Sequence, residues 1–548
     1  MGRFRRAVAL AFAAALAGVL AVPGSASADN SHALISGSGS SWSANAVNQW
    51  IADVQQYGWQ VVYTSVGSAQ GRKDFAYKTT DYAVSDIGYQ GVDPATGDQD
   101  TSLGRAYVYL PIVAGGTAFP YQVRVAGQLV RNIRLSGLTL AKIFTNQITN
   151  WNDPAITADN NGRKLPSIPI IPIVHSEGSG STAQFTRWLA KEYPSLWRPY
   201  SGSSTLTEYY PRKGAQIAQN GSDGVMNFIS SSAANGAIGY DEYSYALGKD
   251  YPVVKLENRA GYFTAPTQYN VAVALTQAKI NLDQNPNHCT ALGYNTSPCY
   301  LLQNLDKVYT YDDPRTYPMS SYSYMIIPTA SDDPRMTTAK RQTLADYITY
   351  SICGGQAEMG PIGYSPLPIN LVQASFNQLQ PLKKADPNVD VSRTKVSKCH
   401  NPTFDPSQPG KNHLAEIAPL PPSCDRAGNG PCDETQGIVN GNPGTSGGPG
   451  GRGGGTTGST GGGSTGGSSG PTSQGSTPGG GSTAPTTGGG SSGSGTTQPL
   501  AVIPEPITID RHRSAGGGLL AVIAALEFLA ILALPPLIVG AFGRRKTP

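Results

Sequence analysis

The sequence has 548 residues, few charges of either sign and few cysteines. Lysine and arginine together number 40 and aspartate and glutamate 36, which leaves a net charge of +4 at neutral pH. This balance is small for the length and includes basic residues at both ends of the chain. It therefore gives no reason to expect a nucleic acid as partner.

The local motif of a serine hydrolase is also missing from the part of the chain that looks folded. Between residues 29 and 382 there is no G-x-S-x-G elbow, and the one match, "GTSGG" from Gly444, lies in a low-complexity segment. His175 with Ser179 or Ser68 could form a nucleophilic pair, because a serine needs a base within hydrogen-bond reach. A phosphatase-like hydrolase is therefore a less favoured alternative, and we predict that the chain is not an enzyme and needs no cofactor.

The N-terminal residues 1–28 have the pattern of a secretory signal peptide. Arg3, Arg5 and Arg6 precede a short apolar run, and Ala26 and Ala28 frame an A-x-A cleavage site. No cysteine follows the apolar run, which excludes the lipid-anchored type of exported protein. We predict that the rest of the chain is exported, from a bacterium that is Gram-positive.

Six cysteines lie in the part predicted to be exported. An even number in an oxidising compartment favours disulfides over metal ligands. No C-x-x-C spacing is present, so a zinc site with the neighbouring His288 or His400 is disfavoured. Pairing of nearest neighbours is the simplest of the fifteen possible connectivities, but the sequence does not fix it. The six are Cys289, Cys299, Cys353, Cys399, Cys424 and Cys432.

The C-terminal segments predict a tether and an anchor. Residues 441–500 are rich in Gly, Ser, Thr and Pro, which favours a disordered stalk or linker. Residues 516–543 are long and apolar enough for one transmembrane helix, which needs about 20 apolar residues. Arg544, Arg545 and Lys546 follow, as expected on the cytoplasmic side. We predict a protein anchored in the membrane by this helix with its body outside the cell.

Residues 29–382 carry the patterning of an α/β domain. Runs such as 59–66, 108–116, 167–175 and 323–328 predict strands, and residues 43–58 and 181–194 predict helices. Their alternation predicts a largely parallel sheet with helices on both faces. Residues 383–440 are richer in Cys and Pro and predict an irregular extension held by disulfides.

The stretch "HSEGSGST" (175–182) opens a predicted helix with small hydroxyl residues and glycines. The unpaired N–H groups of a helix N-terminus can hold an anion without any lysine or arginine. Gly178 and Gly180 let the backbone approach closely, and Ser179 and Ser181 add hydroxyl donors. An ordinary serine cap on a surface helix is the alternative.

Three other stretches favour the anion site. "SGSGSSWSANAVNQW" (36–50) and "YTSVGSAQGRKDF" (63–75) also lead from strands into helices, and "TTDYAVSDIGY" (79–89) places Asp86 after a strand. Such loops could converge at the C-terminal edge of a parallel sheet, where open α/β folds bind ligands. Asp86 as an ordinary turn residue is the alternative reading of the last stretch.

Taken in order, these stretches resemble the phosphate-binding proteins of ABC-type phosphate importers. That family has G-A-G-A-T-F-P, G-I-G-S-S-G-G, A-S-D and R-x-D-G-S-G-T, and this sequence has "GSGSSWS", "SVGSAQG", "VSD" and "HSEGSGS". "LSGLTLAKIFTNQITNWNDPAI" (135–156) also matches a family pattern. The resemblance covers about residues 33–382 and implies a two-lobed periplasmic-binding-protein fold of type II, with lobe one at 33–114 and 320–382 and lobe two at 115–319.

The resemblance also implies ligand contacts at particular positions. Hydroxyl and N–H donors would come from Ser41, Ser68, Ser179, Gly180 and Ser181. Asp86 would accept the proton of a protonated phosphate oxygen, and its ionised carboxylate would repel fully deprotonated sulfate. The family's contacts fall on Ser41, Trp42, Ser68, Asp86, His175, Glu177, Ser179, Gly180 and Ser181.

One position departs from the family pattern. Where the family has an arginine that contacts phosphate and pairs with an aspartate, this chain has His175 and Glu177. Histidine cannot reproduce the two-pronged contact of arginine, and its charge depends on pH and neighbours. It could form a pH-dependent cation beside Glu177, or it could face away from the ligand.

The expected function is capture of inorganic phosphate, or a related oxyanion, for delivery to an ABC permease. A cell-surface adhesion, interaction or sensing protein with a binding-protein fold is the main alternative, because the stalk, the anchor and the missing arginine also fit it.

Overall fold

The computed structural model describes residues 31–432 except 93–96, 98, 292–293, 295–298 and 394. The predicted signal peptide (1–28), linker (441–500) and transmembrane helix (516–543) lie outside the described residues, as do residues 433–440 of the extension. Among the residues that are described, no helix combines the length and apolar character needed to cross a membrane.

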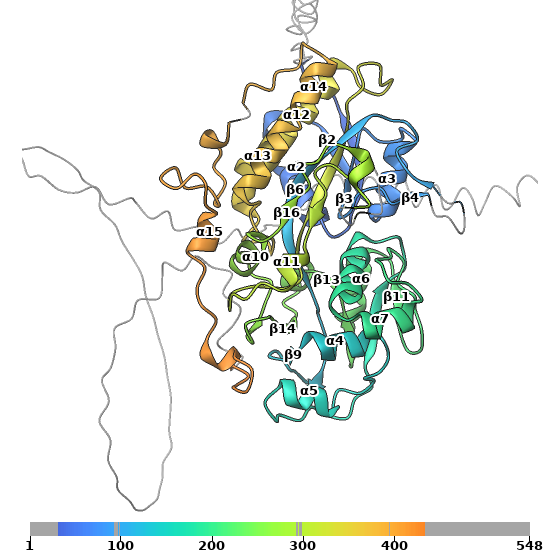
Figure 1. Ribbon diagram of the computed structural model, residues 1–548, viewed down its shortest axis with the longest axis vertical. Coiled ribbons are helices and arrows are strands. Elements are labelled where there is room, and N and C mark those ends of the chain that lie inside the picture. Colours follow the sequence, from blue (N-terminus) through green and yellow to red (C-terminus); the bar gives the residue numbers. More distant parts are fainter. Residues whose placement is uncertain are drawn as a thin grey trace, which may run out of the picture. The chain divides into compact units, whose positions relative to one another are not determined.

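A six-stranded sheet forms the first lobe, in the order β13-β6-β18-β3-β1-β2 (Figure 1). The neighbours β2, β1 and β3 run parallel, and each leads into a loop at the same edge of the sheet. The helices α2, α3, α12 and α13 pack against this sheet. The strands are β1 (Ile35–Gly39), β2 (Val61–Ser65), β3 (Tyr82–Ser85), β6 (Tyr107–Ala118), β13 (Asp241–Glu242) and β18 (Ser320–Pro328).

The helix predicted at residues 43–58 lies in this lobe. Residues 43–58 form α2 followed by a short 3-10 turn, η1 (Gln55–Tyr57), which ends at Gly58 in the left-handed conformation. Buried residues recur along α2 at the spacing of one helix face, so the helix packs by a single apolar side. The helices are α2 (Ala44–Val54), α3 (Ser68–Ala76), α12 (Thr338–Ile352), α13 (Ile369–Asn377) and α14 (Gln380–Ala385).

The second lobe is built on a parallel three-stranded sheet in the order β11-β10-β12. A smaller sheet, β15-β14-β9, adjoins the same segment of chain. The strands are β9 (Arg134–Leu135), β10 (Ile171–His175), β11 (Ile217–Gln219), β12 (Ala237–Gly239), β14 (Lys255–Glu257) and β15 (Phe263–Thr264). The helices are α4 (Gly137–Phe144), α5 (Pro154–Asp159), α6 (Gly180–Glu192), α7 (Pro194–Ser201), α8 (Gly221–Ile229) and α9 (Tyr243–Gly248).

The long strands β6 and β18 carry the chain between the two lobes. They pair with each other from Ser320 opposite Gly116 to Pro328 opposite Tyr107. Because the chain leaves the first lobe along one strand and returns along the other, the pair is antiparallel. The predicted largely parallel arrangement therefore holds for β1 to β3 and for β10 to β12, and it is wrong for the crossing strands.

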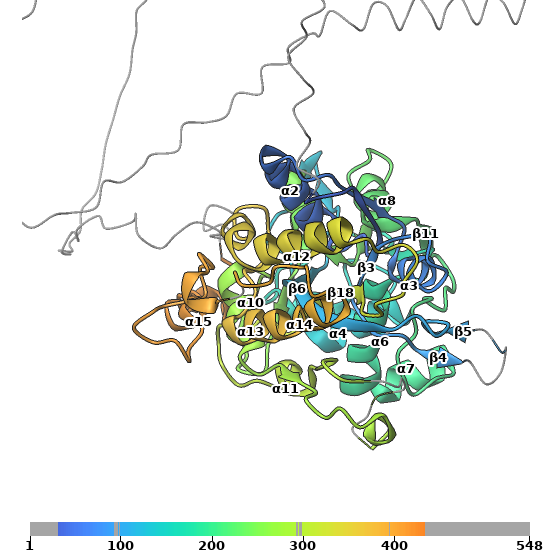
Figure 2. The same ribbon diagram turned by 90° about the horizontal axis from the view of Figure 1, so that it is seen from above.

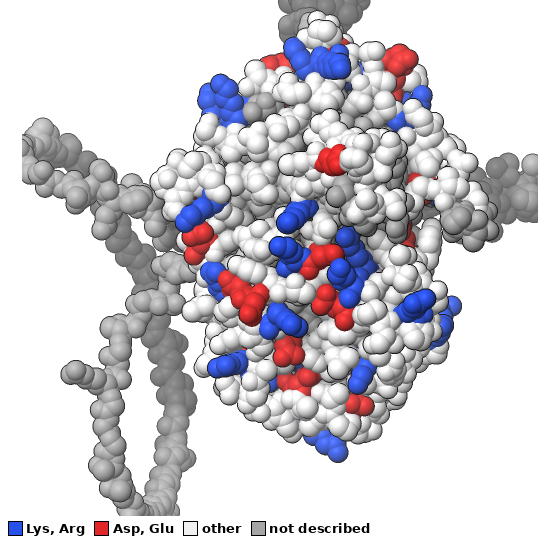
Figure 3. Space-filling view, in the orientation of Figure 1, with Lys and Arg blue, Asp and Glu red and all other residues white. Residues whose placement is uncertain are grey.

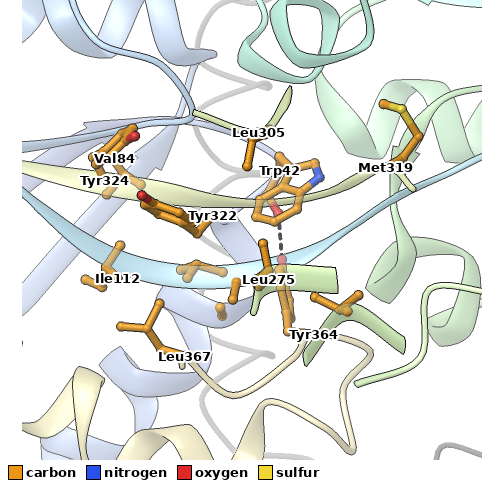
Figure 4. Close-up of a cluster of buried hydrophobic side chains, with 14 of the residues drawn as sticks. Trp42, Val84, Ile112, Leu275, Leu305, Met319, Tyr322, Tyr324, Tyr364 and Leu367 are labelled. Carbon is orange, nitrogen blue, oxygen red and sulfur yellow. Dashed lines mark hydrogen bonds between the residues drawn. The ribbon is translucent and has the colours of Figure 1, made fainter. Parts of the chain in front are cut away.

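One continuous apolar core extends through both lobes and surrounds the crossing strands. Trp42, which follows β1, lies against the crossing strands, and the hydroxyl of Tyr364 donates to its backbone oxygen at 2.6 Å (Figure 4). Tyr322 and Tyr324 pack edge to face on the same side of β18, with their ring centroids 5.5 Å apart. The large aromatic side chains thus fill the space between the sheet and the loops at its edge.

Residues 399–432, which we call the strap, follow the first lobe in sequence. The strap is irregular apart from α15 (His413–Glu416) and a 3-10 turn, η5 (Ser423–Asp425). It lies beside α10 (Gln268–Leu275), as both views show (Figures 1 and 2). It continues toward β14 and β9 (Figure 1). The structure contains the three nearest-neighbour disulfides, Cys289–Cys299, Cys353–Cys399 and Cys424–Cys432.

The end of β1 depends on a glycine. Gly39 has φ +142°, and a Cβ placed there would lie 1.9 Å from the backbone oxygen of Val84. This close approach lets the backbone N–H of Ser40 donate to the same oxygen at 2.8 Å. The loop that carries Ser40 and Ser41 is thereby fixed to the end of β3.

We expect Gly39→Ala to lower the free energy of unfolding by about 3 kcal/mol, because it adds backbone strain and a clash. Gly58→Ala is the matched control, since Gly58 has φ +74° with no atom within 4 Å of the added Cβ. The control should lose only about 1 kcal/mol of strain. Denaturant unfolding of both variants measures the difference, and equal losses would contradict the packing argument.

Candidate functional site

Asp86 is the centre of the candidate site and lies directly after β3. Its side chain is buried, and its two carboxylate oxygens accept hydrogen bonds from three serine hydroxyls. Ser40 donates to Oδ1 at 2.8 Å and to Oδ2 at 2.9 Å, Ser323 to Oδ1 at 2.5 Å and Ser68 to Oδ2 at 3.2 Å. Burial raises the pKa of Asp86 above its ordinary value, although the three hydroxyls and the charge of Arg72 oppose this effect.

The N-terminus of α6 lies against this carboxylate. A Cβ on Gly180 would be 2.2 Å from Oδ2 of Asp86 and 2.5 Å from Oγ of Ser68, so only glycine permits the approach. Ser179 caps the helix by accepting from the backbone N–H of Thr182 at 3.3 Å. The buried hydroxyl of Ser181 has no hydrogen-bond partner among the residues that the structure describes. The helix end thus brings N–H groups and a free hydroxyl to the side of Asp86.

Ser41 lies against a second helix N-terminus, that of α8. The backbone N–H and the hydroxyl of Ser222, in the first turn of α8, donate to Oγ of Ser41 at 3.2 and 3.1 Å. The hydroxyl of Tyr245 donates to the backbone oxygen of Ser41 at 2.6 Å. The indole N–H of Trp42 has no partner in the described part of the chain.

The two lobes touch each other around these residues. The backbone N–H of Ala69 donates to the backbone oxygen of Gly178 at 3.0 Å, and Nε2 of Gln184 donates to the backbone oxygen of Asp86 at 2.8 Å. Arg72 of α3 reaches across to Glu208 in an ion pair that is almost completely buried. The two lobes are therefore closed on each other, and the residues predicted from separate loops lie close together.

A cavity of about 290 Å³ adjoins the site. Its lining includes Gln184, Arg187 and Lys191, which follow Gly180 on one face of α6, and the loop after β3. Lys191 approaches Asp306 at 2.9 Å and Arg187 approaches it at 3.8 Å. Charges of both signs intermix in the middle of the face drawn in Figure 3, so this face carries no patch of a single sign there.

The PBP superfamily domain matches residues 22–354. Phosphate-binding protein PstS 2 of Mycobacterium tuberculosis is 30% identical over 337 residues, which cover 60% of this chain and 82% of that protein. The chain belongs to the PstS-type phosphate-binding proteins. Phosphate-binding protein PstS of Pasteurella multocida is 28% identical over 342 residues, covering 62% of this chain and 88% of that protein. These relatives are named as binding proteins, in agreement with the prediction that the chain is not an enzyme.

Solved structures resemble this PstS-type protein more distantly. A human phosphate-binding apolipoprotein has 19% identity and a TM-score of 0.45, covering 64% of this chain and 94% of its own. A putative phosphate ABC transporter substrate-binding protein from Clostridium perfringens, with bound phosphate, has 14% identity and a TM-score of 0.38. The match covers 61% of this chain and 100% of that chain.

His175, which the sequence resemblance places where the family has an arginine, is buried in the second lobe. Its Nδ1 lies 2.8 Å from Oε1 of Glu177 and its Nε2 lies 3.3 Å from the backbone oxygen of Tyr240. Both neighbours are acceptors, so both ring nitrogens are satisfied only when the ring is protonated. Burial lowers the pKa of His175, but the hydrogen bond and charge of Glu177 outweigh it and raise the pKa above 6.5.

Glu177 is held by the same network. Its Oε1 faces His175, and its Oε2 accepts from the backbone N–H of Gly221 at the start of α8, at 3.0 Å. Burial raises the pKa of Glu177, but these two partners outweigh it and bring the pKa below its ordinary 4.5. Nearby, burial raises the pKa of Asp241 to about 7. Both ring nitrogens of His175 therefore face protein acceptors, an arrangement that favours the protonated ring.

Sequence reasoning missed four residues of the site. Ser40 and Ser323 bond directly to Asp86, Ser222 bonds to Ser41, and Arg72 bonds to Ser85, Asp100 and Glu208. Ser40 was visible inside the quoted stretch "GSGSSWS", whereas Ser323 lies in a strand far along the chain with no motif around it. Arg72 follows Ser68 by one helical turn, but its complete burial could not be read from the sequence.

The cysteines next to the two histidines considered for zinc are oxidised. Cys289 and Cys399 are both in disulfides, so neither supplies a thiolate ligand. His288 instead lies 2.6 Å from Oδ2 of Asp283 on the surface. Within the described ranges, no group of three or more His, Cys, Asp or Glu residues could hold a metal ion.

The His175–Glu177 pair predicts a pH-dependent stability. The raised pKa of His175 makes its contribution complete below pH 6.5 and lost as the pH rises through that pKa. The lowered pKa of Glu177 makes its contribution complete above pH 4.5 and lost as the pH falls. Replacing His175 by Gln should therefore lower the free energy of unfolding most between these two pH values, by about 1 to 3 kcal/mol.

Denaturant unfolding of the parent and His175→Gln across pH 4 to about 9 measures this difference. His288→Gln is the control, because His288 pairs with Asp283 in an exposed position. A His175→Gln effect that stays constant over the whole range would show that the ring is not protonated in the folded protein.

Proposed function

We propose that this protein captures inorganic phosphate outside the membrane and delivers it to an ABC permease. The observation that carries the proposal is the buried Asp86 carboxylate, which three serine hydroxyls surround and against which the N-terminus of α6 closes. A carboxylate accepts hydrogen bonds and does not donate them, so it favours an oxyanion that still carries a proton.

The proposed contacts divide between the two lobes. Ser41, Trp42, Ser68 and Asp86 would approach the ligand from the first lobe, and Ser179, Gly180 and Ser181 from the second. The free hydroxyl of Ser181 and the N–H groups of the helix end would donate to the phosphate oxygens. His175 and Glu177 would act behind this layer, as a charged pair rather than as direct contacts.

Hinge motion about β6 and β18 would admit the ligand, and closure would bring the two half-sites together. The family membership supports phosphate as the ligand, because the relatives are named for binding it. No chemistry on the ligand is needed, so the site requires donors and a selective acceptor but no nucleophile.

The location of the protein is part of the proposal. We propose export through the signal peptide at 1–28 and anchoring at the surface of a Gram-positive bacterium by the helix at 516–543. The linker at 441–500 would let the binding domain reach the permease while raising its local concentration there. Uptake that is equally fast with the anchored and the released protein would argue against a role of the anchor in delivery.

Gly180→Ala should abolish measurable phosphate binding, a loss of at least about 100-fold, because its Cβ would occupy the place of Oδ2 of Asp86 when the lobes close. The second lobe should still fold, since the clash arises only between lobes. Calorimetric titration with phosphate and with sulfate measures binding, and circular dichroism checks the fold.

Gly224→Ala is the matched control. Gly224 is also a helical glycine, and a Cβ there would meet only ordinary contacts at 3.7 Å. Its phosphate affinity should equal that of the parent. If the parent itself gave no heat with phosphate or sulfate at pH 6 or 8, the transport proposal would fail and the adhesion or sensing alternative would replace it.

A further inference from the structure

Ser323 lies on the crossing strand β18, opposite a local irregularity of β6. Ser323 pairs with Val113 and the next residue, Tyr324, pairs with Pro111, so Ile112 is an extra residue in β6. An extra residue of this kind bends a strand and changes where neighbouring side chains point. Tyr322 and Tyr324 face one side of the strand, and Ser323 faces the other, toward Asp86.

The serines around Asp86 form an ordered chain of donors. The backbone N–H of Ser43 donates to Oγ of Ser40 at 3.2 Å, and the hydroxyl of Ser43 donates to Oγ of Ser323 at 2.8 Å. Ser40 and Ser323 are thereby left to donate their own protons to Asp86. Ser43 is completely buried, so no solvent competes with this order.

The donors are distributed unevenly over the two carboxylate oxygens. Oδ1 accepts from Ser323 at 2.5 Å and shares the single proton of the Ser40 hydroxyl, at 2.8 Å, with Oδ2. Oδ2 shares the Ser40 hydroxyl and has Ser68 at the longer distance of 3.2 Å. Oδ2 is also the oxygen that the N-terminus of α6 approaches at Gly180. The oxygen on the ligand side therefore has the more distant donors of the two.

We propose that Ser323 is a positioning residue that holds Oδ1 of Asp86 and leaves Oδ2 to the protonated oxygen of the ligand, so that it sets the preference for phosphate over sulfate. This inference rests on the proposed function. Ser323 touches no ligand itself. It acts from the strand about which the lobes move, so the orientation of Asp86 is linked to the crossing strands.

Removal of the Ser323 hydroxyl should lower phosphate affinity about tenfold, because a hydrogen bond to a charged group is lost. Sulfate affinity should stay the same or rise, so the ratio of the two affinities should fall. The loss of a donor should also favour the protonated form of Asp86, and the pH below which sulfate binds should move upward. Calorimetry of Ser323→Ala with phosphate and sulfate from pH 5 to about 8 measures both effects.

Ser321→Ala is the matched control, since Ser321 is a buried serine two residues away on the same strand and is not a partner of Asp86. A Ser323→Ala variant that loses affinity for both ions by the same factor, or for neither, would overturn the inference. Carbon-13 NMR titration of Asp86 without any ion tests it separately. A higher midpoint in Ser323→Ala supports the positioning role even if the parent binds no phosphate, and an unchanged midpoint contradicts it.

A second inference comes from an independent feature, the strap. At its start, the Cys353–Cys399 disulfide joins it to the end of α12 in the first lobe. Nδ2 of Asn401 and Oγ1 of Thr403, both buried, donate to the backbone oxygen of Leu367 at 2.9 and 3.0 Å. The strap therefore begins with one covalent and two polar attachments to the first lobe.

In its middle, the strap packs on α10, which itself contacts β6 and β18. Leu414 and Ala415 of α15 share an apolar cluster with Tyr269 and Ala272 of α10. Nη1 of Arg315 donates to the backbone oxygen of Ala415 at 3.0 Å. The contact between α15 and α10 places the strap beside the crossing strands, because α10 packs on both of them.

At its end, the strap is fixed to the second lobe. Arg134 of β9 is buried and donates to the backbone oxygens of Cys424 at 2.9 Å and Asn429 at 2.6 Å. Lys255 of β14 pairs with Asp425 at 2.6 Å. The strap is thus a connection between the lobes in addition to the two crossing strands.

We infer that the strap limits how far the lobes separate and thereby slows release of the ligand. A protease recognition sequence inserted at the exposed residues 406–410 allows the strap to be cut after folding, with both of its ends still attached. The same insertion at the exposed turn of Gly162 is the control, because it lies within the second lobe alone.

Cutting the strap should raise the phosphate dissociation rate about tenfold in stopped-flow measurements and increase the radius of gyration in solution scattering without phosphate. Cutting at Gly162 should change neither. If both quantities are the same before and after the strap is cut, the inference is wrong. The scattering result stands independently of whether phosphate is the ligand.

Discussion

The burial of one carboxylate, that of Asp86, determines how the surrounding structure is built. A buried charge is costly unless hydrogen bonds satisfy it, and Asp86 obtains them from Ser40, Ser68 and Ser323. These serines come from the loop after β1, the start of α3 and the crossing strand. Even the backbone oxygen of Asp86 is held, by Gln184 of the second lobe. The lobes therefore close on a site whose acceptor is already in place.

The basic groups closest to the proposed contacts, Arg72 and His175, are buried and paired with acidic groups. The ring of His175 is turned toward Glu177 and Tyr240, and the charge of Arg72 is neutralised by Asp100 and Glu208. Positive potential near Asp86 comes from the charge of Arg72, from the N-terminus of α6 and from the serine hydroxyls. Such a site would hold an anion through oriented hydrogen-bond donors and the exclusion of water more than through net charge. The proposed selectivity for a protonated oxyanion follows from this arrangement.

The sequence allowed a large part of the fold to be predicted, together with several of the residues that the structure brings together in the candidate site. The loops with Ser41, Ser68, Asp86 and Gly180 follow strands or open helices, so local patterns locate them. Ser323 could not be found in this way, because its role depends on an extra residue in the partner strand, β6. The orientation of His175 was likewise undetermined, since only packing shows that both ring nitrogens face acceptors. The antiparallel crossing strands and the attachment of the strap to both lobes depend on contacts distant in sequence.

A crystal structure of the protein with phosphate bound tests the central claim most directly. The account predicts that a phosphate oxygen lies within hydrogen-bond distance of Oδ2 of Asp86, with the hydroxyl of Ser181 and the N–H groups of α6 as donors and His175 still paired with Glu177. Phosphate bound instead beside Arg187 and Lys191, or held directly by the His175 ring, would contradict it.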